Sequence, residues 1–247
     1  MTIVISLGGS IVAPQEGPSG LFLLQFRNVL LSWLEAENRK AIIVVGGGSA
    51  ARRWQKAYKE FIEQAAERET SNDGNRGVEP ARALYLDESL DRIGIAATRL
   101  NAQLVKEVFS DYCPDSVVTD PSADISMRGE ILVAAGWKPG FSTDYDAVLL
   151  AERFHANQIL NLSNISQIYS ADPKKDPGAK PLAHITFDAL LEMTGRVWNP
   201  GANLPFDPIA AAKAKELGLR VIFASGSNLE NFDKILSEKS FIGTIID

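Results

Sequence analysis

Residues 41–54 read AIIVVGGGSAARRW, an apolar run followed by three glycines, a serine, two alanines, two arginines and a tryptophan. The run has no polar face, which is typical of a strand in a parallel sheet that helices cover on both sides. Residues 46–48 predict a turn, and the helix expected from about Ser49 begins with unpartnered N–H groups and a partial positive charge. Arg52 and Arg53 in its first turn are unfavourable unless an anion is present. The stretch therefore predicts a phosphate site.

The bulk composition is that of a soluble globular protein. At 247 residues, with 45% hydrophobic and 23% charged residues, the chain is long enough to bury a large core. A net charge of -6 and a pI near 5.1 argue against a protein that binds nucleic acid through many Lys and Arg contacts. No apolar stretch reaches the roughly 18 residues of a membrane span, and the N-terminus lacks the pattern of a signal peptide. We therefore expect a cytoplasmic protein with no membrane partner.

The chain has a single cysteine, Cys113, so an internal disulfide is excluded. His155 and His184 lie far from it in sequence, without the spacing of a zinc site. We interpret Cys113 as a structural thiol and expect no metal ion held by protein side chains.

Strand-like and helix-like segments alternate along the chain. Strands are predicted at residues 2–7, 41–45, 116–120, 131–136, 157–162, 219–224 and 241–246. Helices are predicted at residues 21–37, 49–66, 88–109, 143–154, 187–194, 208–217 and 229–236. Residues 67–81 contain almost nothing that could be buried, so we expect a mobile surface loop there. Residues 163–180 predict a hairpin or excursion.

This order of segments predicts an α/β fold, with a mainly parallel sheet sandwiched by helices in three layers. No linker divides residues 1–247, which indicates one domain. Ligands of such sheets bind beyond the carboxyl ends of the strands. Four loops follow predicted strands, and we expect them to converge on one cleft: residues 8–10, 46–48, 136–143 and 163–169.

Three phosphate-binding patterns compete for the glycine-rich turn. The Walker pattern is excluded, because no glycine is followed by Lys and then Ser or Thr. The dinucleotide pattern is matched by Gly46, Gly48 and Ala51, but the acidic residue that it needs about 20 positions later would fall in the polar 67–81 segment. The third possibility is a fold with two glycine loops, one per substrate, facing each other across the strand ends.

Six segments, in order, resemble the amino acid kinase family, and within it the archaeal type of uridylate kinase, which transfers phosphate from ATP to UMP. They are ISLGGS at 5–10, VGGGSAAR at 45–52, DRIGIAATRLNA at 91–102, GWKPGFSTDYDA at 136–147, SNISQIYSADPKKDPGAK at 163–180 and FDPIAAAKA at 206–214. The resemblance implies a three-layer kinase fold, with residues 1–150 as an acceptor-binding lobe and residues 151–247 as an ATP-binding lobe. It also implies Mg²⁺ as cofactor and a homo-oligomer, a dimer or hexamer.

The resemblance also implies the residues of the site. Those for ATP are Ser6, Leu7, Gly8, Gly9, Ser10, Gly48, Arg52, Ser163, Asn164, Tyr169 and Asp172. Those for UMP are Gly47, Asp91, Trp137, Lys138, Pro139, Gly140, Phe141, Ser142 and Thr143. Those that assist the transfer itself are Gly9, Arg52 and Lys174.

Two of these assignments compete with simpler interpretations. Asp91 is implied to accept hydrogen bonds from the ribose hydroxyls, but ESLD at 88–91 also fits a charge near a helix start. Lys174 could stabilise charge on the phosphoryl group or belong to a solvated pair with Lys175.

The chain departs from the family pattern at a few positions. Ser6 stands where many members have a lysine, and Trp137, Ser166 and Gln167 also differ from the usual residues. These departures leave a second hypothesis open, a non-catalytic nucleotide- or oxyanion-binding or storage protein on the same scaffold. Kinases of acetylglutamate or aspartate fit less well, because Asp91 and the 136–143 loop suit a nucleotide. An isopentenyl phosphate kinase would be expected to have a histidine near the glycine triplet, and none is there.

Overall fold

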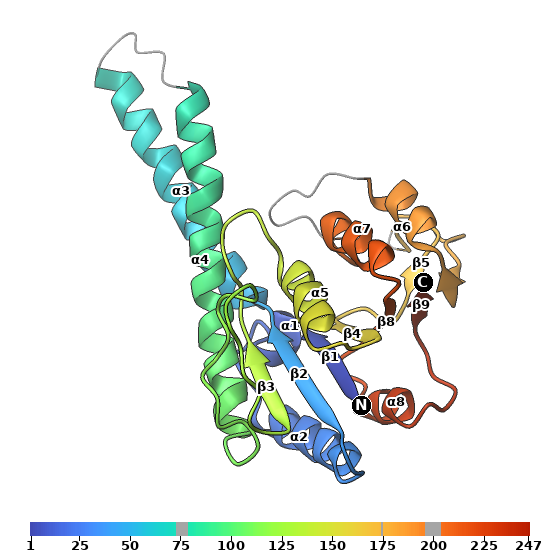
Figure 1. The fold of residues 1–247 in the computed structure, drawn as a ribbon. Coiled ribbons are helices and arrows are strands. Elements are labelled where there is room, and N and C mark those ends of the chain that lie inside the picture. The colour runs from blue at the N-terminus through green and yellow to red at the C-terminus, as the bar shows by residue number, and fades with distance from the viewer. Residues whose placement is uncertain (73–78, 174, 196–203) are drawn as a thin grey trace.

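A seven-stranded sheet runs through the protein (Figure 1). The structure is a computed structural model that describes residues 1–72, 79–173, 175–195 and 204–247. In spatial order the strands are β3 (Ile131–Ala134), β2 (Lys40–Val45), β1 (Thr2–Leu7), β4 (Gln158–Ser163), β8 (Arg220–Ser225), β9 (Thr244–Ile246) and β7 (His184–Ile185). All neighbours are parallel except β8 and β9, which pair antiparallel. The predicted mainly parallel sheet is therefore confirmed.

The central strands are apolar because helices cover both of their faces. Residues 42–45 of β2 are 0% exposed, as the unbroken apolar run predicts. In β1, Ile3, Ile5 and Leu7 face one helix layer, whereas Val4 faces the other. Leu7 lies beside Val45 in the register of the pair. The two glycine segments therefore leave the sheet side by side.

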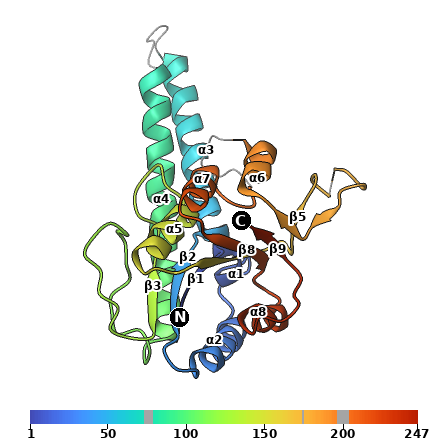
Figure 2. The ribbon, with the colours of Figure 1, turned by 45° about the vertical axis from the view of Figure 1, so that its right-hand side comes forward.

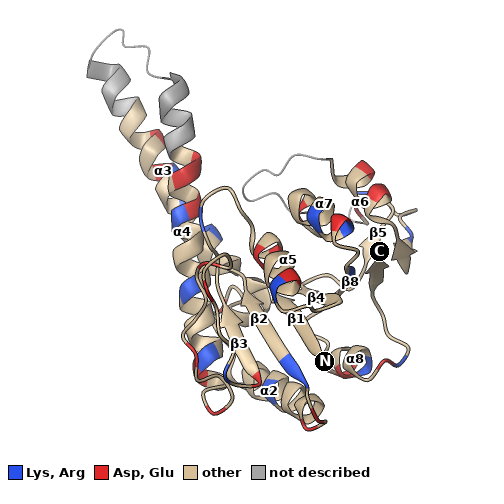
Figure 3. Ribbon diagram, in the orientation of Figure 1, with Lys and Arg blue, Asp and Glu red and all other residues tan. Residues whose placement is uncertain are grey.

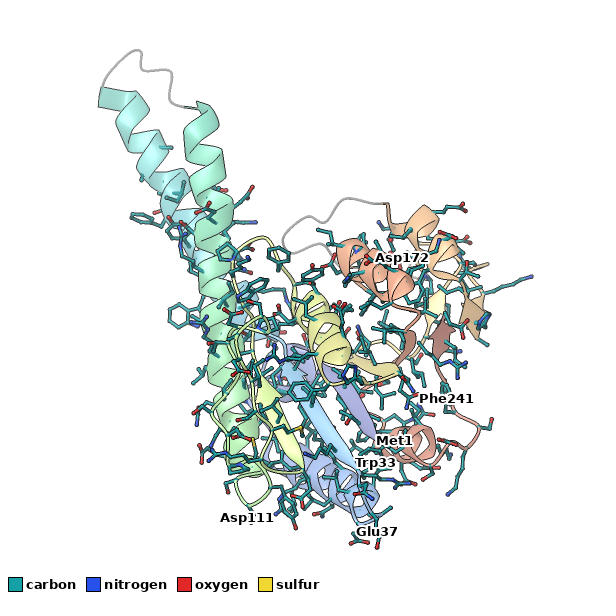
Figure 4. All side chains as sticks on the ribbon, in the orientation of Figure 1. Met1, Trp33, Glu37, Asp111, Asp172 and Phe241 are labelled. Atoms are coloured by element: carbon teal, nitrogen blue, oxygen red, sulfur yellow. The ribbon has the colours of Figure 1, made fainter. Side chains whose placement is uncertain are left out.

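Each helix layer has its own core. On one face lie α1 (Gly9–Val12), α2 (Gly20–Leu34), α4 (Glu79–Val108) and α8 (Leu229–Leu236). On the other lie α5 (Thr143–Arg153), α6 (Phe187–Thr194) and α7 (Pro208–Glu216), as Figure 2 shows. Phe26 of α2 fixes the first layer, because its ring stacks on Phe232 at 5.3 Å and meets the edge of Phe109 at 6.1 Å. Figure 4 shows how densely side chains fill both layers.

A long helical hairpin projects from the sheet, formed by α3 (Gly48–Asn72) and α4 (Figures 1 and 2). The prediction of a loop at residues 67–81 is wrong at both ends, since α3 continues to Asn72 and α4 begins at Glu79; residues 73–78 lie outside the described part. Polar composition misled the prediction, because two helices that pair with each other beyond the sheet do not need a wide apolar face. Figure 3 shows the charged residues along the part of this hairpin nearer the sheet.

Two predicted strands differ from the structure. Residues 116–120 form no strand, and only Val118 makes a bridge, to Ala134. The predicted strand at 241–246 is shortened to β9, because the backbone N–H and C=O of Ile242 bond the side chain of Asn231 at 2.8 and 2.7 Å. Because these two backbone groups bond a side chain of α8, they are not available to pair with a neighbouring strand.

Several local predictions are confirmed. The 163–180 segment contains β5 (Ile168–Tyr169), which pairs antiparallel with β6 (Pro181–Leu182). Thr186 caps α6 by accepting from Ala189 N at 3.1 Å, and Asp207 caps α7 by accepting from Ile209 N at 2.8 Å. Cys113 is buried, at 1% exposure.

Within the described residues, no helix is both long and apolar enough to span a bilayer.

Candidate functional site

The two glycine loops, residues 8–10 and 46–48, touch each other at the carboxyl ends of β1 and β2. A Cβ atom on Gly9 would overlap the backbone N of Gly48 and the carbonyl of Gly46, and a Cβ on Gly46 would lie 2.7 Å from Gly9 N. Gly48 also has a φ of +61°, a conformation that favours glycine. Only residues without side chains allow these loops to meet.

Free backbone N–H groups gather where the loops meet. Gly9 begins α1 and Gly48 begins α3, and the first N–H groups of a helix have no partner within it. By contrast, Gly8 and Gly46 continue the sheet, since their N–H groups donate to Leu162 O and Leu7 O, both at 2.9 Å. The two helix starts offer adjacent donors to an anion.

Arg52 joins the two loops. Its Nη2 donates to Ser10 Oγ at 2.8 Å, so a guanidinium from α3 lies against the start of α1. Ser49 makes a parallel contact, donating from Oγ to Ala13 O at 2.5 Å. The arginine is exposed, and its charge lies where the sequence predicted an anion.

A cavity of about 600 Å³ opens beside these loops. All four loops that were expected to converge contribute to its wall, which confirms the predicted cleft. Its lining consists of Ser10, Gly47, Gly48, Ala51, Arg52, Gln55, Asp91, Gly94, Ile95, Thr98, Gly136, Phe141, Ser142, Thr143 and Asn164.

One face of α4 holds two of the loops in place. Asn101 Nδ2 donates to Gly46 O at 2.9 Å and to Gly47 O at 3.2 Å. Thr98 Oγ1 accepts from Gly136 N at 2.8 Å. Both side chains are buried, at 4% and 6% exposure. The helix thus fixes the second glycine loop and the β3–α5 loop, residues 135–142, relative to each other.

Asp91 lies on the same face of α4 and closes one side of the cavity. Its Oδ2 accepts from Gly140 N at 2.7 Å. Partial burial raises the pKa of Asp91 above its ordinary value, and the Gly140 N–H opposes that change while Asp87 and Glu88 add to it. The alternative of a helix-start charge is wrong, because α4 begins at Glu79.

Aromatic rings of the β3–α5 loop and of the first turn of α5 pack against one another. Trp137 and Phe141 lie 5.2 Å apart, Phe141 and Tyr145 4.9 Å apart, all tilted. Lys138 Nζ sits 3.7 Å from the centre of the Trp137 ring. Such a contact holds a cation by the ring's quadrupole. Of these side chains, Phe141 reaches the cavity wall.

Two carboxylates, Asp144 and Asp207, lie next to each other at the starts of α5 and α7. Asp144 Oδ1 accepts from Ser6 Oγ at 2.9 Å, and its Oδ2 accepts from Asp207 N at 3.3 Å. Although Asp144 as a residue is half-buried, its carboxyl lies among buried partners. That burial raises the pKa of Asp144 to about 6, and the nearby charge of Asp207 adds to the rise. Burial raises the pKa of Asp207 as well.

Asp146 is a third carboxylate, 1% exposed. Its Oδ2 accepts from Trp137 N at 3.2 Å, whereas its Oδ1 has no hydrogen-bond partner within the described part of the chain. Burial raises the pKa of Asp146 to about 7. Burial of a carboxyl whose second oxygen lacks a donor disfavours its ionised form, so Asp146 keeps its proton at pH values below about 7.

Other predicted site residues lie outside the cavity wall. Ser6 and Leu7 are buried, at 5% and 0% exposure, and Gly8 is part of the backbone ladder. Ser163 ends β4, Tyr169 belongs to β5, and the carbonyl of Asp172 accepts from Asp176 N at 2.9 Å. Pro139 lies within the β3–α5 loop, and Lys174 lies outside the described residues. The roles predicted for these residues stay predictions.

Sequence reasoning missed part of the wall although a signal was present. On α4, Ile95 and Thr98 follow the predicted residue Asp91 at helical spacing. On α3, Ala51 and Gln55 follow the predicted residue Gly48 in the same way, so each predicted residue indicates its neighbours on the same helix face. The buried carboxylates were missed for another reason. Asp144 and Asp207 fit helix starts equally well, and only the fold brings them together.

Comparison with known proteins decides the family. A profile of the amino acid kinase family matches residues 1–225. The chain belongs to the amino acid kinase family. It is 32% identical to a uridylate kinase of Methanospirillum hungatei, over 99% of this chain and 94% of that protein. It is 30% identical to a uridylate kinase of Methanococcus aeolicus over the whole of both chains.

Solved structures agree with that membership of the amino acid kinase family. A uridylate kinase from Archaeoglobus fulgidus superposes with a TM-score of 0.75 at 28% identity, covering 100% of both chains. A UMP kinase from Bacillus anthracis has a TM-score of 0.69 at 19% identity, covering 100% of this chain and 95% of that one. The second likeness shows that the fold extends beyond near relatives.

We predict that Gly9→Ala abolishes anion binding at the glycine loops. The added Cβ overlaps the backbone of the second loop, so the two helix starts must separate. Isothermal titration with ATP measures the binding, and thermal unfolding the accompanying loss of stability. Gly20→Ala is the control, because a Cβ there would point into open space. Wild-type binding by Gly9→Ala would contradict the assignment.

We predict that Asp146→Asn changes the pH dependence of stability. The folded pKa of about 7 exceeds the ordinary 3.8, so the folded state binds more protons between these values. The contribution of Asp146 to the free energy of unfolding is therefore present below about pH 4 and is lost as pH rises through 7. Urea unfolding from pH 4 to 8 should show a smaller decline for Asp146→Asn than for the wild type.

Asp233→Asn, a change at an exposed position of α8, is the control and should keep the wild-type decline. Equal pH profiles for Asp146→Asn and the wild type would show that Asp146 is ionised in the folded protein.

Proposed function

We propose that the protein is a uridylate kinase, which transfers the γ-phosphoryl group of ATP to UMP. The observation that carries this proposal is the direct contact of two glycine loops, each at the start of a helix, beside a cavity of about 600 Å³. Two phosphate-binding starts in contact suit two phosphates that exchange a group in line. The relatives named as uridylate kinases, similar over full length, support the choice of substrates.

The proposed roles follow from the position of each group. The amides at Gly9, Ser10 and Gly48 hold the phosphates of ATP, and Arg52 stabilises the charge that spreads over the transferring group. UMP lies between α4 and the β3–α5 loop, with its base against Phe141 and its ribose hydroxyls at Asp91. Asp91 Oδ2 already accepts from Gly140 N, so its other oxygen is the one proposed to meet the ribose.

Mg²⁺ is proposed to enter with ATP. Across residues 1–72, 79–173, 175–195 and 204–247, no group of three or more His, Cys, Asp or Glu side chains is arranged to hold a metal ion. Mg²⁺ in nucleotide enzymes is bound largely through substrate phosphates and water. A metal carried by the nucleotide therefore needs no such group of side chains. The ion would neutralise phosphate charge, and the chain's own residues orient the two substrates.

The transfer needs no covalent protein intermediate. Phosphoryl transfer depends on alignment and on charge stabilisation. In this chain Ser6 is bound to Asp144, so we assign charge stabilisation, among the residues that the structure describes, to the loop amides and to Arg52. We propose residues 1–150 as the acceptor half and residues 151–247 as the half that completes the ATP site. The predicted cytoplasmic location stays a prediction.

We predict that the purified protein forms ADP from ATP and Mg²⁺ with UMP and not with acetylglutamate, in a coupled assay. CMP and dUMP define how strictly the base and the ribose are recognised. Arg52→Ala should lower kcat by about a hundredfold or more, because a charge contact at the transferring group is lost. Arg53→Ala, one residue further along α3, is the matched control. Nucleotide binding without turnover would support the storage hypothesis instead.

We also propose that two copies associate through the outer face of α3. Trp54 and Phe61 are 69% and 62% exposed, and Phe61 stacks on Tyr58 at 6.3 Å, so three aromatic rings share one helix face. An exposed aromatic stripe of this kind is typical of an interface.

The charged residues of this segment lie on other sides of α3, where Lys56 pairs with Glu60 within the helix at 3.6 Å. The stripe itself is therefore aromatic. Because a two-fold axis places the same patch of two copies face to face, the stripe of one copy would cover that of the other.

We predict that the wild type sediments as a dimer or as a larger assembly of dimers, and that Trp54→Glu with Phe61→Glu yields monomers. Sedimentation velocity at micromolar concentration distinguishes the two. Leu21→Glu, at an equally exposed position of α2, should leave the mass unchanged. A monomeric wild type would overturn the proposal.

A further inference from the structure

Hydrogen bonds through two buried carboxylates, Asp144 and Asp207, join elements that carry different loops of the site. Asp207, at the start of α7, is 5% exposed. Its Oδ2 accepts from the hydroxyl of Ser142, the residue that precedes α5. Its own N–H donates to Asp144 Oδ2 at 3.3 Å. The start of α7 is thus tied to both the end of the β3–α5 loop and the first turn of α5.

Asp144 extends this connection to the strands that carry the other loops. Its Oδ1 accepts from Ser6 Oγ at 2.9 Å and from Asn161 Nδ2 at 3.1 Å. Ser6 lies in β1, two residues before Gly8, and Asn161 lies in β4, two residues before Ser163. The two carboxylates therefore lie between the loop proposed for UMP and the strand ends proposed for ATP.

A helix cap alone does not account for Asp207. One side-chain oxygen suffices to cap a helix, as Ser19, Thr186 and Asn228 do elsewhere in this chain. Asp207 uses Oδ1 for its cap, from Ile209 N at 2.8 Å, and a second oxygen for Ser142. Burying a carboxylate beside Asp144 has an unfavourable desolvation cost that a serine would avoid. We therefore attribute the bond between the second oxygen and Ser142 to a role other than capping α7.

We propose that Asp207 is a positioning residue that fixes the β3–α5 loop relative to the glycine loops and so aligns UMP with ATP. This inference rests on the proposed kinase function. Asp207 lies behind Ser142 and acts through it, without a contact of its own to the phosphates. Because in-line transfer tolerates little displacement, a shift of about 1 Å in the acceptor lowers the rate by about a hundredfold.

The test replaces Asp207 by Ser, which keeps a capping oxygen and loses the reach to Ser142. Hydrogen exchange of residues 136–142, measured without nucleotide, should become about tenfold faster. In the coupled assay kcat/KM for UMP should fall by about tenfold to a hundredfold, with the KM for ATP changed less than about twofold. Asp207→Asn can still bond Ser142 through its amide, so it should keep most of the wild-type kcat/KM for UMP.

Asn228→Ser is the matched control, because it exchanges the cap of α8 on the other face of the sheet. It should alter neither the exchange of residues 136–142 nor the KM for UMP. Asp207→Thr is the second variant if Asp207→Ser does not fold.

If residues 136–142 of Asp207→Ser exchange at the wild-type rate, the proposal is overturned. An equal loss of affinity for both nucleotides would overturn it as well. Failure of both the Ser and the Thr variants to fold would also overturn it, since Asp207 would then serve the fold itself. The exchange measurement needs no turnover. A wild type inactive with UMP would therefore refute the kinase function while the exchange result still decides whether Asp207 holds the loop.

Discussion

No side chain fits between the two glycine loops, and the rest of the site depends on that contact. Backbone against backbone is the closest approach that two chain segments can make, and it brings the starts of α1 and α3 together. The parallel register of β1 and β2 makes the approach possible, because Leu7 and Val45 end level with each other. Arg52, Asn101 and the cavity are arranged around this point.

Much of the fold could be predicted because its signals are local. The apolar run of β2, the Asp207–Pro208 helix start and the glycine triplet each determine structure within a few residues. Where prediction failed, a distant partner decided the outcome. Asn231 takes the backbone of Ile242 from the sheet, and α3 pairs with α4 along segments whose polarity indicates a loop.

The same distinction explains the site. Residues that bind through backbone groups, such as Gly9 and Gly48, could be found because glycine has few other reasons to cluster. Asp144, Asp146 and Asp207 could not be found in this way. An aspartate at a helix start is ordinary in sequence, and its burial against other carboxylates appears only when α5 and α7 pack side by side. Their raised pKa values reflect that packing.

Helix α3 carries two surfaces close together, the cavity wall and the exposed aromatic stripe. Its first turn provides Arg52 to the cavity, and two residues later Trp54 faces solvent at 69% exposure. A helix is stiff over such a short distance, so whatever orders the outer surface also restricts the backbone that carries Arg52. With the outer face paired as proposed, phosphate affinity would depend on protein concentration, and dilution alone would weaken nucleotide binding.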